Sequence, residues 1–421
     1  MDINEILKGV NCGCGKVHTF TIEKIYVERD AISHLKELCA EYDHIVLVAD
    51  ENTYKAAGDE TEASLLGKEI QRVIFSGKDV VIPDERAIEE VMKYSSFADI
   101  FVGVGSGVMQ DLCKYVSHVT QKPYIIVATA PSMDGYASSG AAMILKGMKE
   151  TVPAGLPLAI LADTKVLAAA PMEMIKAGFG DIIGKYSALN DWRLSAIING
   201  EYFCDYIYNV TYEMIEKVLK TAKGLLLRNE ESIKAVTEAL MIVGIMMSFA
   251  TNSRPASGSE HHLSHFFEIT GIVKQKPYLA HGIDVFYSTY ITAKIREKLL
   301  LRDFSKEIYR QDAEEYKNAI ENAYGVSVGH ECIALQKRVG FYEKDRSCVY
   351  KTKETEIKNV LAEMPTAEEI KGMLDLVQLD LKDFYDTYGE EEIKKAVKYA
   401  KDLKDRFTVL WVNYDLLGGT L

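Results

Sequence analysis

The hydrophobic and polar positions of this 421-residue chain follow two different patterns. Over residues 24–162, short apolar runs rich in β-branched residues alternate with stretches in which apolar residues recur every three or four positions. The runs predict strands buried on both faces, and the stretches between them predict amphipathic helices. Alternation of this kind predicts a doubly wound parallel sheet, an α/β fold that binds ligands at the carboxyl ends of its strands. The predicted strands lie in HIVLVAD, EIQRVIFSG, ADIFVGVGSG, KPYIIVATA and LAILAD.

After residue 171 the strand pattern stops and only helices are predicted. They cover residues 181–198, 204–227 and 233–250, and two or more follow His281. A further helix begins in TAEEIKGML, where Thr366 and Glu369 have the spacing of a capping box. We therefore expect an α/β domain at residues 1–170 and an all-helical domain at residues 171–421.

The composition excludes some classes of function. A formal net charge of -13 argues against nucleic acid as the main partner, and an anionic substrate would need lysines or arginines gathered near the chemistry. Seven scattered cysteines are typical of reduced thiols rather than of a disulfide framework. No signal-peptide pattern is found, and the apolar run ALMIVGIMMSFA is too short to cross a bilayer, so we expect a cytoplasmic protein without a membrane span.

Near the start of the chain, NCGCGKVH sets Cys12, Cys14 and His18 close together. This spacing is not a usual zinc pattern, and no second pair of ligands follows. A loose glycine-rich arm is therefore the favoured interpretation over a small metal knuckle.

A glycine-rich segment, FVGVGSGVMQDLCKYVS, runs from a predicted strand through Gly103, Gly105 and Gly107 into a predicted helix. Glycines allow the backbone to approach a pyrophosphate closely, and the helix N-terminus supplies amide donors. The motif is not G-x-G-x-x-G, so a tight strand-to-helix turn explains it equally well. Asp50, after the strand HIVLVA, can accept hydrogen bonds from a ribose and would repel a 2′-phosphate, which favours NAD over NADP; its alternative role is to cap the next helix.

The strand YIIVATA leads into the loop PSMDGYASSGA. Thr129, Ser132, Asp134 and Ser138 supply hydroxyls and a carboxylate there, beside Gly135. Such residues occur in any turn, but their position at the same sheet edge as the glycine segment predicts a shared binding site.

Three histidines lie within SGSEHHLSHFFE. His261 and His265 are four apart and share one face of a helix, whereas His262 points elsewhere. His281 can come from the following helix, and Asp181 can add a carboxylate, a ligand set that suits a divalent metal such as zinc. Surface or capping histidines, or a histidine serving as a base, are the alternatives; no G-x-S-x-G elbow supports hydrolase chemistry.

Five segments together resemble a known family. GVGSG…D…K, TAPSMDGYASSGA, AGFGDIIGK, RPASGSEHHLSH and LAHG occur in the order seen in the sn-glycerol-1-phosphate dehydrogenases, a branch of the iron-containing alcohol dehydrogenase and dehydroquinate synthase superfamily. The resemblance covers residues 24–296 and leaves out the N-terminal arm and the C-terminal tail. It implies a dehydroquinate synthase-like fold, in which a nucleotide-binding α/β domain precedes a helical domain that binds metal and substrate. The implied reaction is the reversible, NAD(P)H-dependent, metal-assisted reduction of dihydroxyacetone phosphate to sn-glycerol 1-phosphate, by a homo-oligomer of two or more subunits.

The resemblance also implies roles for single residues. Asp181, His261 and His281 match metal ligands, with zinc or nickel as the metal; His265 and Asp134 match residues that contact the substrate, so that His265, Asp134 and Asp181 form the expected catalytic set. The positions that match the cofactor site are Asp50, Gly105, Ser106, Gly107, Asp111, Thr129, Ser132 and Ser138.

Three basic residues in or beside these motifs are candidates for binding a phosphate: Lys185, Arg193 and, first to be tested, Arg254. Each can instead be an ordinary ion-pair partner. His265 either relays a proton or hydrogen-bonds a substrate hydroxyl. Three other functions stay open: a dehydrogenase of another small polyol such as glycerol, a dehydroquinate synthase-like lyase, and a nucleotide-binding sensor without turnover.

Overall fold

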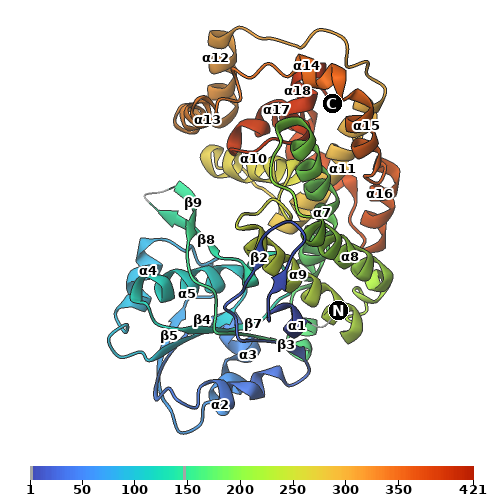
Figure 1. Cartoon of the computed structure of the whole chain (residues 1–421). Coiled ribbons are helices and arrows are strands. Elements are labelled where there is room, and N and C mark those ends of the chain that lie inside the picture. Colours follow the sequence, from blue (N-terminus) through green and yellow to red (C-terminus); the bar gives the residue numbers. More distant parts are fainter. Residues whose placement is uncertain (1–2, 146–147) are drawn as a thin grey trace. The chain divides into compact units, whose positions relative to one another are not determined.

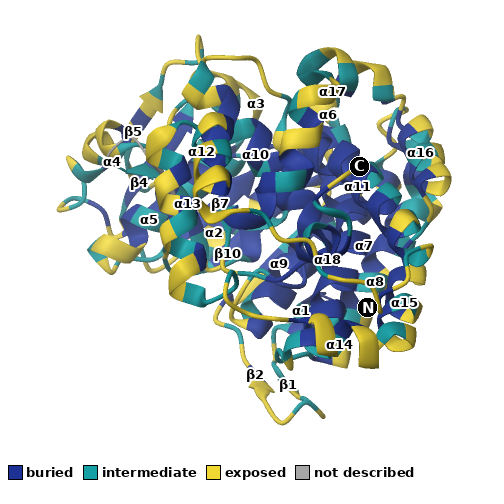
Figure 2. Ribbon diagram, turned by 90° about the horizontal axis from the view of Figure 1, so that it is seen from above, coloured by how far each residue is buried: buried dark blue, intermediate teal, exposed yellow. Residues whose placement is uncertain are grey.

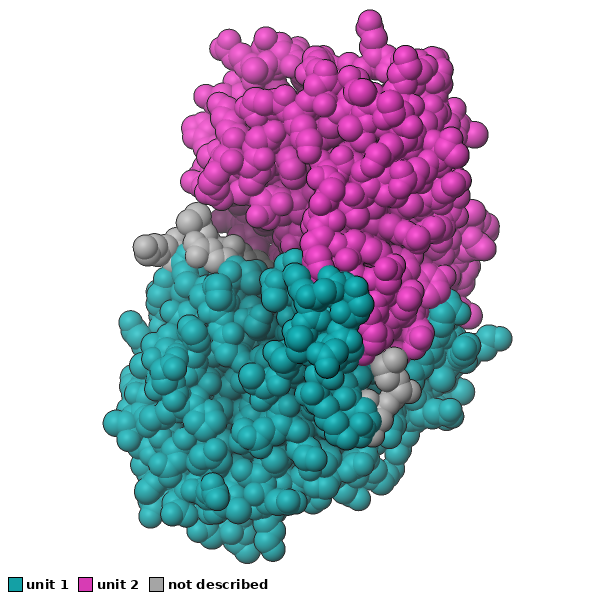
Figure 3. All heavy atoms as spheres, viewed as in Figure 1, with its two compact units in different colours: residues 1–182, 216–252 teal, residues 183–215, 253–421 magenta. Residues whose placement is uncertain are grey.

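The computed structural model describes residues 3–145 and 148–421, and contacts divide the chain into two compact units (Figure 3). Unit 1 comprises Met1–Ile182 and Glu216–Asn252, and unit 2 comprises Ile183–Ile215 and Ser253–Leu421. Two helices, α7 (Met172–Asn199) and α8 (Asp205–Thr221), continue from one unit into the other along the chain. The division into domains at residue 170 stays a prediction.

Unit 1 is built on a six-stranded sheet in which every neighbouring pair is parallel (Figure 1). Its strand order is β3-β10-β7-β6-β4-β5. The predicted doubly wound sheet is confirmed, and the five predicted strands are β4, β5, β6, β7 and β10. The sixth, β3, is added at one edge. The strands are β3 (Lys24–Glu28), β4 (His44–Asp50), β5 (Glu69–Phe75), β6 (Ile100–Gly105), β7 (Tyr124–Ala128) and β10 (Ala159–Asp163).

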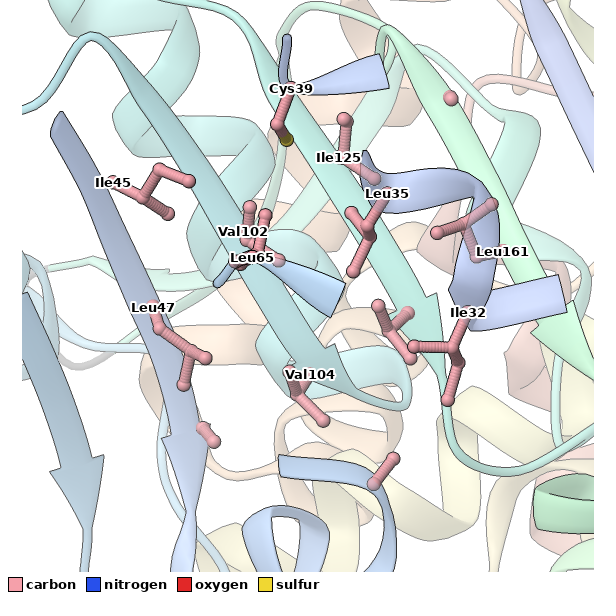
Figure 4. Close-up of a cluster of buried hydrophobic side chains, with 14 of the residues drawn as sticks. Ile32, Leu35, Cys39, Ile45, Leu47, Leu65, Val102, Val104, Ile125 and Leu161 are labelled. Carbon is pink, nitrogen blue, oxygen red and sulfur yellow. The ribbon is translucent and has the colours of Figure 1, made fainter. Parts of the chain in front are cut away.

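Both faces of this sheet are covered, because successive side chains of a strand point to opposite faces. On one face, Ile45 and Leu47 of β4 belong to a buried hydrophobic cluster with Ile32 and Leu35 (Figure 4). On the other face, Val46 of β4 joins the cluster of helices α4 and α5. The covering elements are η1 (Ala31–His34, a 3-10 helix), α2 (Leu35–Leu38), α3 (Glu51–Ser64), α4 (Glu85–Met92), α5 (Gly107–Thr120) and α6 (Thr164–Ala169).

The strand order changes direction between β4 and β6. From β4 the chain moves outward to β5, then returns to β6 on the other side of β4 and continues through β7 to β10. Ligands of open α/β sheets bind at such a switch point, outside the carboxyl ends of the strands. Asp50 ends β4 and Gly105 ends β6, so the two predicted cofactor segments lie at this point.

Two antiparallel hairpins were not among the predicted elements. One pairs β1 (Val10–Asn11) with β2 (Val17–His18), after the short helix α1 (Ile3–Ile6), and the other pairs β8 (Gly140–Leu145) with β9 (Met148–Pro153). The first hairpin contradicts the expectation of a loose N-terminal arm, because its strands are paired and His18 is buried. The seven cysteines, all of them among the described residues, form no disulfide bond.

Helix α9 (Glu230–Ala250) belongs to unit 1 and is largely buried (Figure 2). It packs against α6, β3 and the 3-10 helix η2 (Asp134–Ala137), and η3 (Ala222–Gly224) precedes it. Among the described residues, α9 is the helix long and apolar enough to cross a membrane, but 83% of its most apolar window is buried inside the protein. That burial is typical of a core helix, as predicted, although the helix is longer than its apolar run.

Unit 2 is helical, and beyond β10 no strand occurs among residues 164–421, as predicted. Helix α11 contacts α10, α15, α16 and α18. Thr366 and Glu369 form the predicted capping box at the start of α16, and Gly389, at φ +73°, breaks α17. The helices are α10 (Ser259–Lys274), α11 (His281–Leu300), α12 (Ala313–Tyr324), α13 (Val326–Val339), α14 (Ser347–Thr352), α15 (Glu354–Ala362), α16 (Ala367–Leu376), α17 (Leu381–Tyr399), η4 (Ala400–Leu403) and α18 (Val409–Leu417).

Candidate active site

The glycine segment forms the turn between β6 and α5. A Cβ atom at Gly105 would lie 2.4 Å from Cγ of Met109, so the turn requires glycine there. Among the described residues, a Cβ atom at Gly107 would meet only the side chain of Met133, at 3.5 Å or more. The side chain of Ser106, at the N-cap, makes no capping hydrogen bond to α5. The first N–H groups of α5 therefore donate no hydrogen bond to the N-cap side chain, and the glycines let a ligand come close to them. Such a helix N-terminus fits a bound phosphate group.

Asp50 caps helix α3. Its Oδ1 atom accepts hydrogen bonds from the backbone N–H groups of Asn52 (2.8 Å) and Thr53 (2.9 Å), and Thr53 completes a capping box. The capping alternative is therefore what the structure contains. Because both bonds end on Oδ1, capping is compatible with a second bond from a ribose hydroxyl to Oδ2, and the ribose role stays a prediction.

The loop after β7 is joined to the end of β6. Thr129 donates its backbone N–H to the carbonyl of Gly105 at 3.1 Å. The Tyr136 hydroxyl donates to the carbonyl of Ala130 at 2.9 Å. Ser132, which lies between Ala130 and Tyr136 in the sequence, is half-buried. Thr129 and Ser132 therefore lie at the same sheet edge as the glycine turn, as the sequence predicts.

Lys114 of α5 binds the loop after β7 through hydrogen bonds, and it was missed as a site residue. Its fully buried ammonium donates to the carbonyls of Gly135 (3.0 Å) and Gly140 (2.8 Å) and lies 3.5 Å from Oδ1 of Asp111. Burial lowers the pKa of Lys114, and Asp111 partly offsets the effect. The hydroxyl of Ser138 lies 3.5 Å from the same ammonium. The signal that could have identified Lys114 is its place three residues after Asp111, on the same face of α5.

Two helices of unit 1 pack against the Pro131–Ala137 segment through glycines. A Cβ atom at Gly178 of α7 would lie 1.8 Å from the carbonyl oxygen of Pro131, and one at Gly244 of α9 would lie 2.8 Å from the carbonyl oxygen of Asp134. One turn after Gly178, the buried carboxylate of Asp181 accepts the backbone N–H of Asp134 at 3.1 Å. Unit 1 thus brings two predicted catalytic residues, Asp134 and Asp181, together.

The predicted histidine cluster forms within unit 2. His261 and His265 come from α10, and His281 is the first residue of α11. The ring centres are 5.1 Å apart for His261 and His281, 5.9 Å for His261 and His265, and 5.5 Å for His265 and His281. His262 is buried away from them, and neither of its ring nitrogens has a hydrogen-bond partner among the described residues.

Glu260 contacts the imidazole ring of His261, and it too was missed as a site residue. One of its carboxylate oxygens lies 2.7 Å from Nδ1 of His261 and accepts the backbone N–H of Gly258 at 2.8 Å. Burial, reinforced by Asp191, raises the pKa of Glu260 to about 7. Burial and the nearby charge of Lys185 hold the pKa of His261 well below its usual value. A neutral His261 that donates from Nδ1 presents its Nε2 lone pair, which is the form of histidine that binds metals.

The donor set of this cluster fits a divalent metal. Within unit 2, ligand atoms of His265, Glu268 and His281 lie within 4.8 Å of one another, and His261 stands beside them. Neutral imidazoles with a carboxylate are ligands that suit zinc and nickel. Asp181 belongs to unit 1, so the predicted set of Asp181, His261 and His281 stays a prediction.

The chain is similar in sequence to curated dehydrogenases. Residues 26–171 match the family model described as iron-containing alcohol dehydrogenase. The glycerol-1-phosphate dehydrogenase (NAD(P)+) of Bacillus licheniformis is 30% identical over 424 residues, which cover 97% of this chain and 94% of that protein. The protein of the same name from Halalkalibacterium halodurans is 35% identical over 292 residues, 68% of this chain and 73% of that protein. The chain belongs to the glycerol-1-phosphate dehydrogenase family.

Solved structures support the fold of this family member. A 1,3-propanediol oxidoreductase superposes with a TM-score of 0.63 at 13% identity, covering 93% of this chain and 94% of that one. The B. licheniformis alignment reaches beyond residues 24–296. Likeness to the glycerol-1-phosphate dehydrogenases therefore includes the parts of the arm and the tail that the five motifs left out.

Two of the three predicted phosphate-binding residues are engaged elsewhere in this family member. The buried guanidinium of Arg254 pairs with the carboxylate of Glu201, at 2.6 Å from Nε, and donates to the carbonyl of Phe407 at 2.8 Å. Arg193 pairs with Glu363 at 2.9 Å. The ion-pair alternative describes both arginines, and the third predicted residue, Lys185, is buried on α7 near His261.

Proposed function

We propose that the chain catalyses the reversible, NAD(P)H-dependent reduction of dihydroxyacetone phosphate to sn-glycerol 1-phosphate, assisted by one divalent metal ion. The observation that carries the proposal is the 30% identity to a glycerol-1-phosphate dehydrogenase over nearly the whole of both chains. A histidine cluster with a neutral, oriented His261 supports the metal-assisted part. A cytoplasmic location and a homo-oligomeric state belong to the same proposal.

Asp181, His261 and His281 are the proposed ligands of a zinc or nickel ion. When bound, such an ion is a Lewis acid that stabilises negative charge on a carbonyl oxygen. Glu260 lies 2.7 Å from Nδ1 of His261, so it would hold the Nδ1 proton and leave Nε2 free to bind the ion. Asp181 also anchors the loop, since it accepts the backbone N–H of Asp134.

Asp134 and His265 are the proposed substrate contacts, and Lys185 is the proposed partner of the substrate phosphate. His265 is half-buried beside His281, where an imidazole can donate a hydrogen bond to a substrate hydroxyl or return a proton to it. Lys185 supplies positive charge in a protein whose net charge is negative, as recognition of a phosphate requires.

Asp50 and the turn at Gly105, Ser106 and Gly107 are the proposed binding elements for the cofactor, which supplies the hydride when bound. The turn and the first amides of α5 would hold the pyrophosphate, and Asp50 would accept a ribose hydroxyl, which favours NAD over NADP. Asp111, Thr129, Ser132 and Ser138 complete the proposed cofactor site. Within it, Lys114 fixes the loop through the carbonyl of Gly135.

The test is NADH oxidation with dihydroxyacetone phosphate, run on the purified protein before and after chelation and after addition of zinc or nickel. We expect activity that the chelator abolishes and one metal restores, a product that chiral analysis identifies as sn-glycerol 1-phosphate, and much slower turnover of unphosphorylated dihydroxyacetone. Equal turnover of dihydroxyacetone would instead indicate a dehydrogenase of simple polyols. Product formation without net NADH consumption would indicate a lyase.

Variants test the ligands. His261→Ala and Asp181→Asn should each lose bound metal and activity, because each removes a ligand, while circular dichroism stays unchanged. His262→Leu, on the other face of α10, is the matched control and should keep both. Normal metal content in His261→Ala or Asp181→Asn would contradict the assignment.

A further inference from the structure

The N-terminal hairpin gathers two thiols and an imidazole in one tight turn. Strands β1 and β2 pair Val10 with His18, and the turn between them is closed by hydrogen bonds from the N–H of Cys12 to the carbonyl of Lys16 and from the N–H of Gly15 to the carbonyl of Cys12, both 3.1 Å long. Gly15 lies at φ +86°, which favours glycine. Cys12 and Cys14 therefore stand two residues apart in a fixed turn.

The ligand atoms of this turn have the spacing of a metal site. The sulfur atoms of Cys12 and Cys14 and a ring nitrogen of His18 lie within 4.8 Å of one another, and Cys14 Sγ lies 3.5 Å from Nε2 of His18. At zinc–sulfur and zinc–nitrogen bonds of about 2.3 Å and 2.0 Å, tetrahedral ligand atoms are separated by roughly 3.5–3.8 Å. A small inward movement of the side chains is enough to reach that geometry.

The imidazole is held in place by unit 1. His18 is 2% exposed, and its ring stacks on Phe249 of α9 with ring centres 5.1 Å apart and planes 15° apart. Across the hairpin, a Cβ atom at Gly9 would lie 2.9 Å from the carbonyl oxygen of His18, so glycine allows the close approach there. Fixing a ligand before the ion arrives lowers the entropic cost of binding.

We propose that Cys12, Cys14 and His18 bind a structural zinc ion, separate from the metal of the proposed dehydrogenase reaction. Two thiolates and an imidazole are soft to borderline ligands that suit zinc, whereas the proposed catalytic set has oxygen and nitrogen donors only. Binding displaces one proton from each thiol and leaves one coordination position for water or a further donor. The ion would tie the hairpin turn, between β1 and β2, to the ring that packs on α9.

Cobalt substitution tests the site apart from catalysis, because only a thiolate ligand gives the intense near-ultraviolet charge-transfer band of cobalt. The full chain, reduced and freed of metal, is titrated with cobalt. We expect the band in the wild-type protein and its loss in Cys12→Ser and in Cys14→Ser, whose half-buried side chains tolerate serine. Cys348→Ser, at an exposed thiol in α14, is the matched control and should keep the band.

Two further variants separate this zinc site from the proposed catalytic metal. His261→Ala, which tests the proposed catalytic metal, should leave the thiolate band intact, so the two proposals can fail independently. Zinc content of the protein as purified should fall by one ion per chain in the double variant Cys12→Ser/Cys14→Ser relative to Cys348→Ser. A wild-type protein without the band, or a double variant with unchanged band and zinc content, would overturn the proposal.

Discussion

Gly178→Ala perturbs the contact that holds the Pro131–Ala137 loop. The added methyl would lie 1.8 Å from the carbonyl oxygen of Pro131, whereas ordinary contacts begin at 3.4 Å, so helix or loop must move by about 1.6 Å. Such overpacking costs about 1–3 kcal/mol of unfolding free energy. The matched control is Gly372→Ala in α16, where no atom of the described residues lies within 4 Å of the new methyl. Each alanine also gains about 1 kcal/mol of helix propensity, so the difference between the two variants isolates the overpacking.

The assay is urea unfolding followed by far-ultraviolet circular dichroism, since both tryptophans, Trp192 and Trp411, lie in unit 2 and do not report on unit 1. We expect Gly178→Ala to be about 1–3 kcal/mol less stable than Gly372→Ala, and its KM for NADH or substrate to rise because the loop carries proposed site residues. If the two variants differ by less than about 0.5 kcal/mol and share the same kinetics, the inference of a closely packed loop is refuted.

Other side chains give three further expectations. Glu260→Gln replaces the carboxyl group that contacts Nδ1 of His261 with an amide that orients the ring less well. Metal affinity, measured against a chromophoric chelator, should fall about 10- to 100-fold, whereas Glu363→Gln should leave it unchanged. Asp50→Asn keeps the α3 cap and should weaken the binding of NADH relative to NADPH without loss of stability. Asp50→Ala also removes the cap and should cost about 1 kcal/mol of unfolding free energy in addition. An unaltered cofactor preference in both variants would contradict the ribose role of Asp50. Burial holds the pKa of His262 well below 6.5, so as the pH falls below 6.5 the unfolded chain binds a proton that the folded chain does not, and the free energy of unfolding falls by up to about 1.4 kcal/mol per pH unit. His262→Leu should therefore make the free energy of unfolding less dependent on pH between pH 6.5 and 5. Equal slopes of unfolding free energy against pH in the variant and the wild type would contradict this.

Strands were predictable from sequence where both of their faces are buried. β4 is an uninterrupted apolar run because helices cover both sides, and such runs are visible without a structure. β3, at the sheet edge, begins with Lys24 and ends with Glu28, and only Ile25 and Val27 are buried, so its signal is weak. The β1–β2 hairpin has two-residue strands, and its pairing depends on turn hydrogen bonds rather than on an apolar pattern.

The histidine cluster was predictable because helix geometry alone places residues four apart on one face. Glu260 was not, since a glutamate beside a histidine is usually solvated, and its raised pKa arises from burial near Asp191, 69 residues earlier in the chain. Arg254 shows the same limit. Its partner Glu201 is 53 residues away, and tertiary packing, not local pattern, decides between an ion pair and an anion site.

Because α9 lies after residues 183–215 in the sequence, unit 1 is synthesised in two separate stages. The sheet and η2 leave the ribosome first, residues 183–215 follow, and only then does the helix that packs on η2 and β3 emerge. Until then the apolar surface that α9 covers is open to chaperones and to other nascent chains. A fragment that stops at residue 182 would keep that surface open permanently, so a soluble nucleotide-binding fragment has to retain residues 216–252.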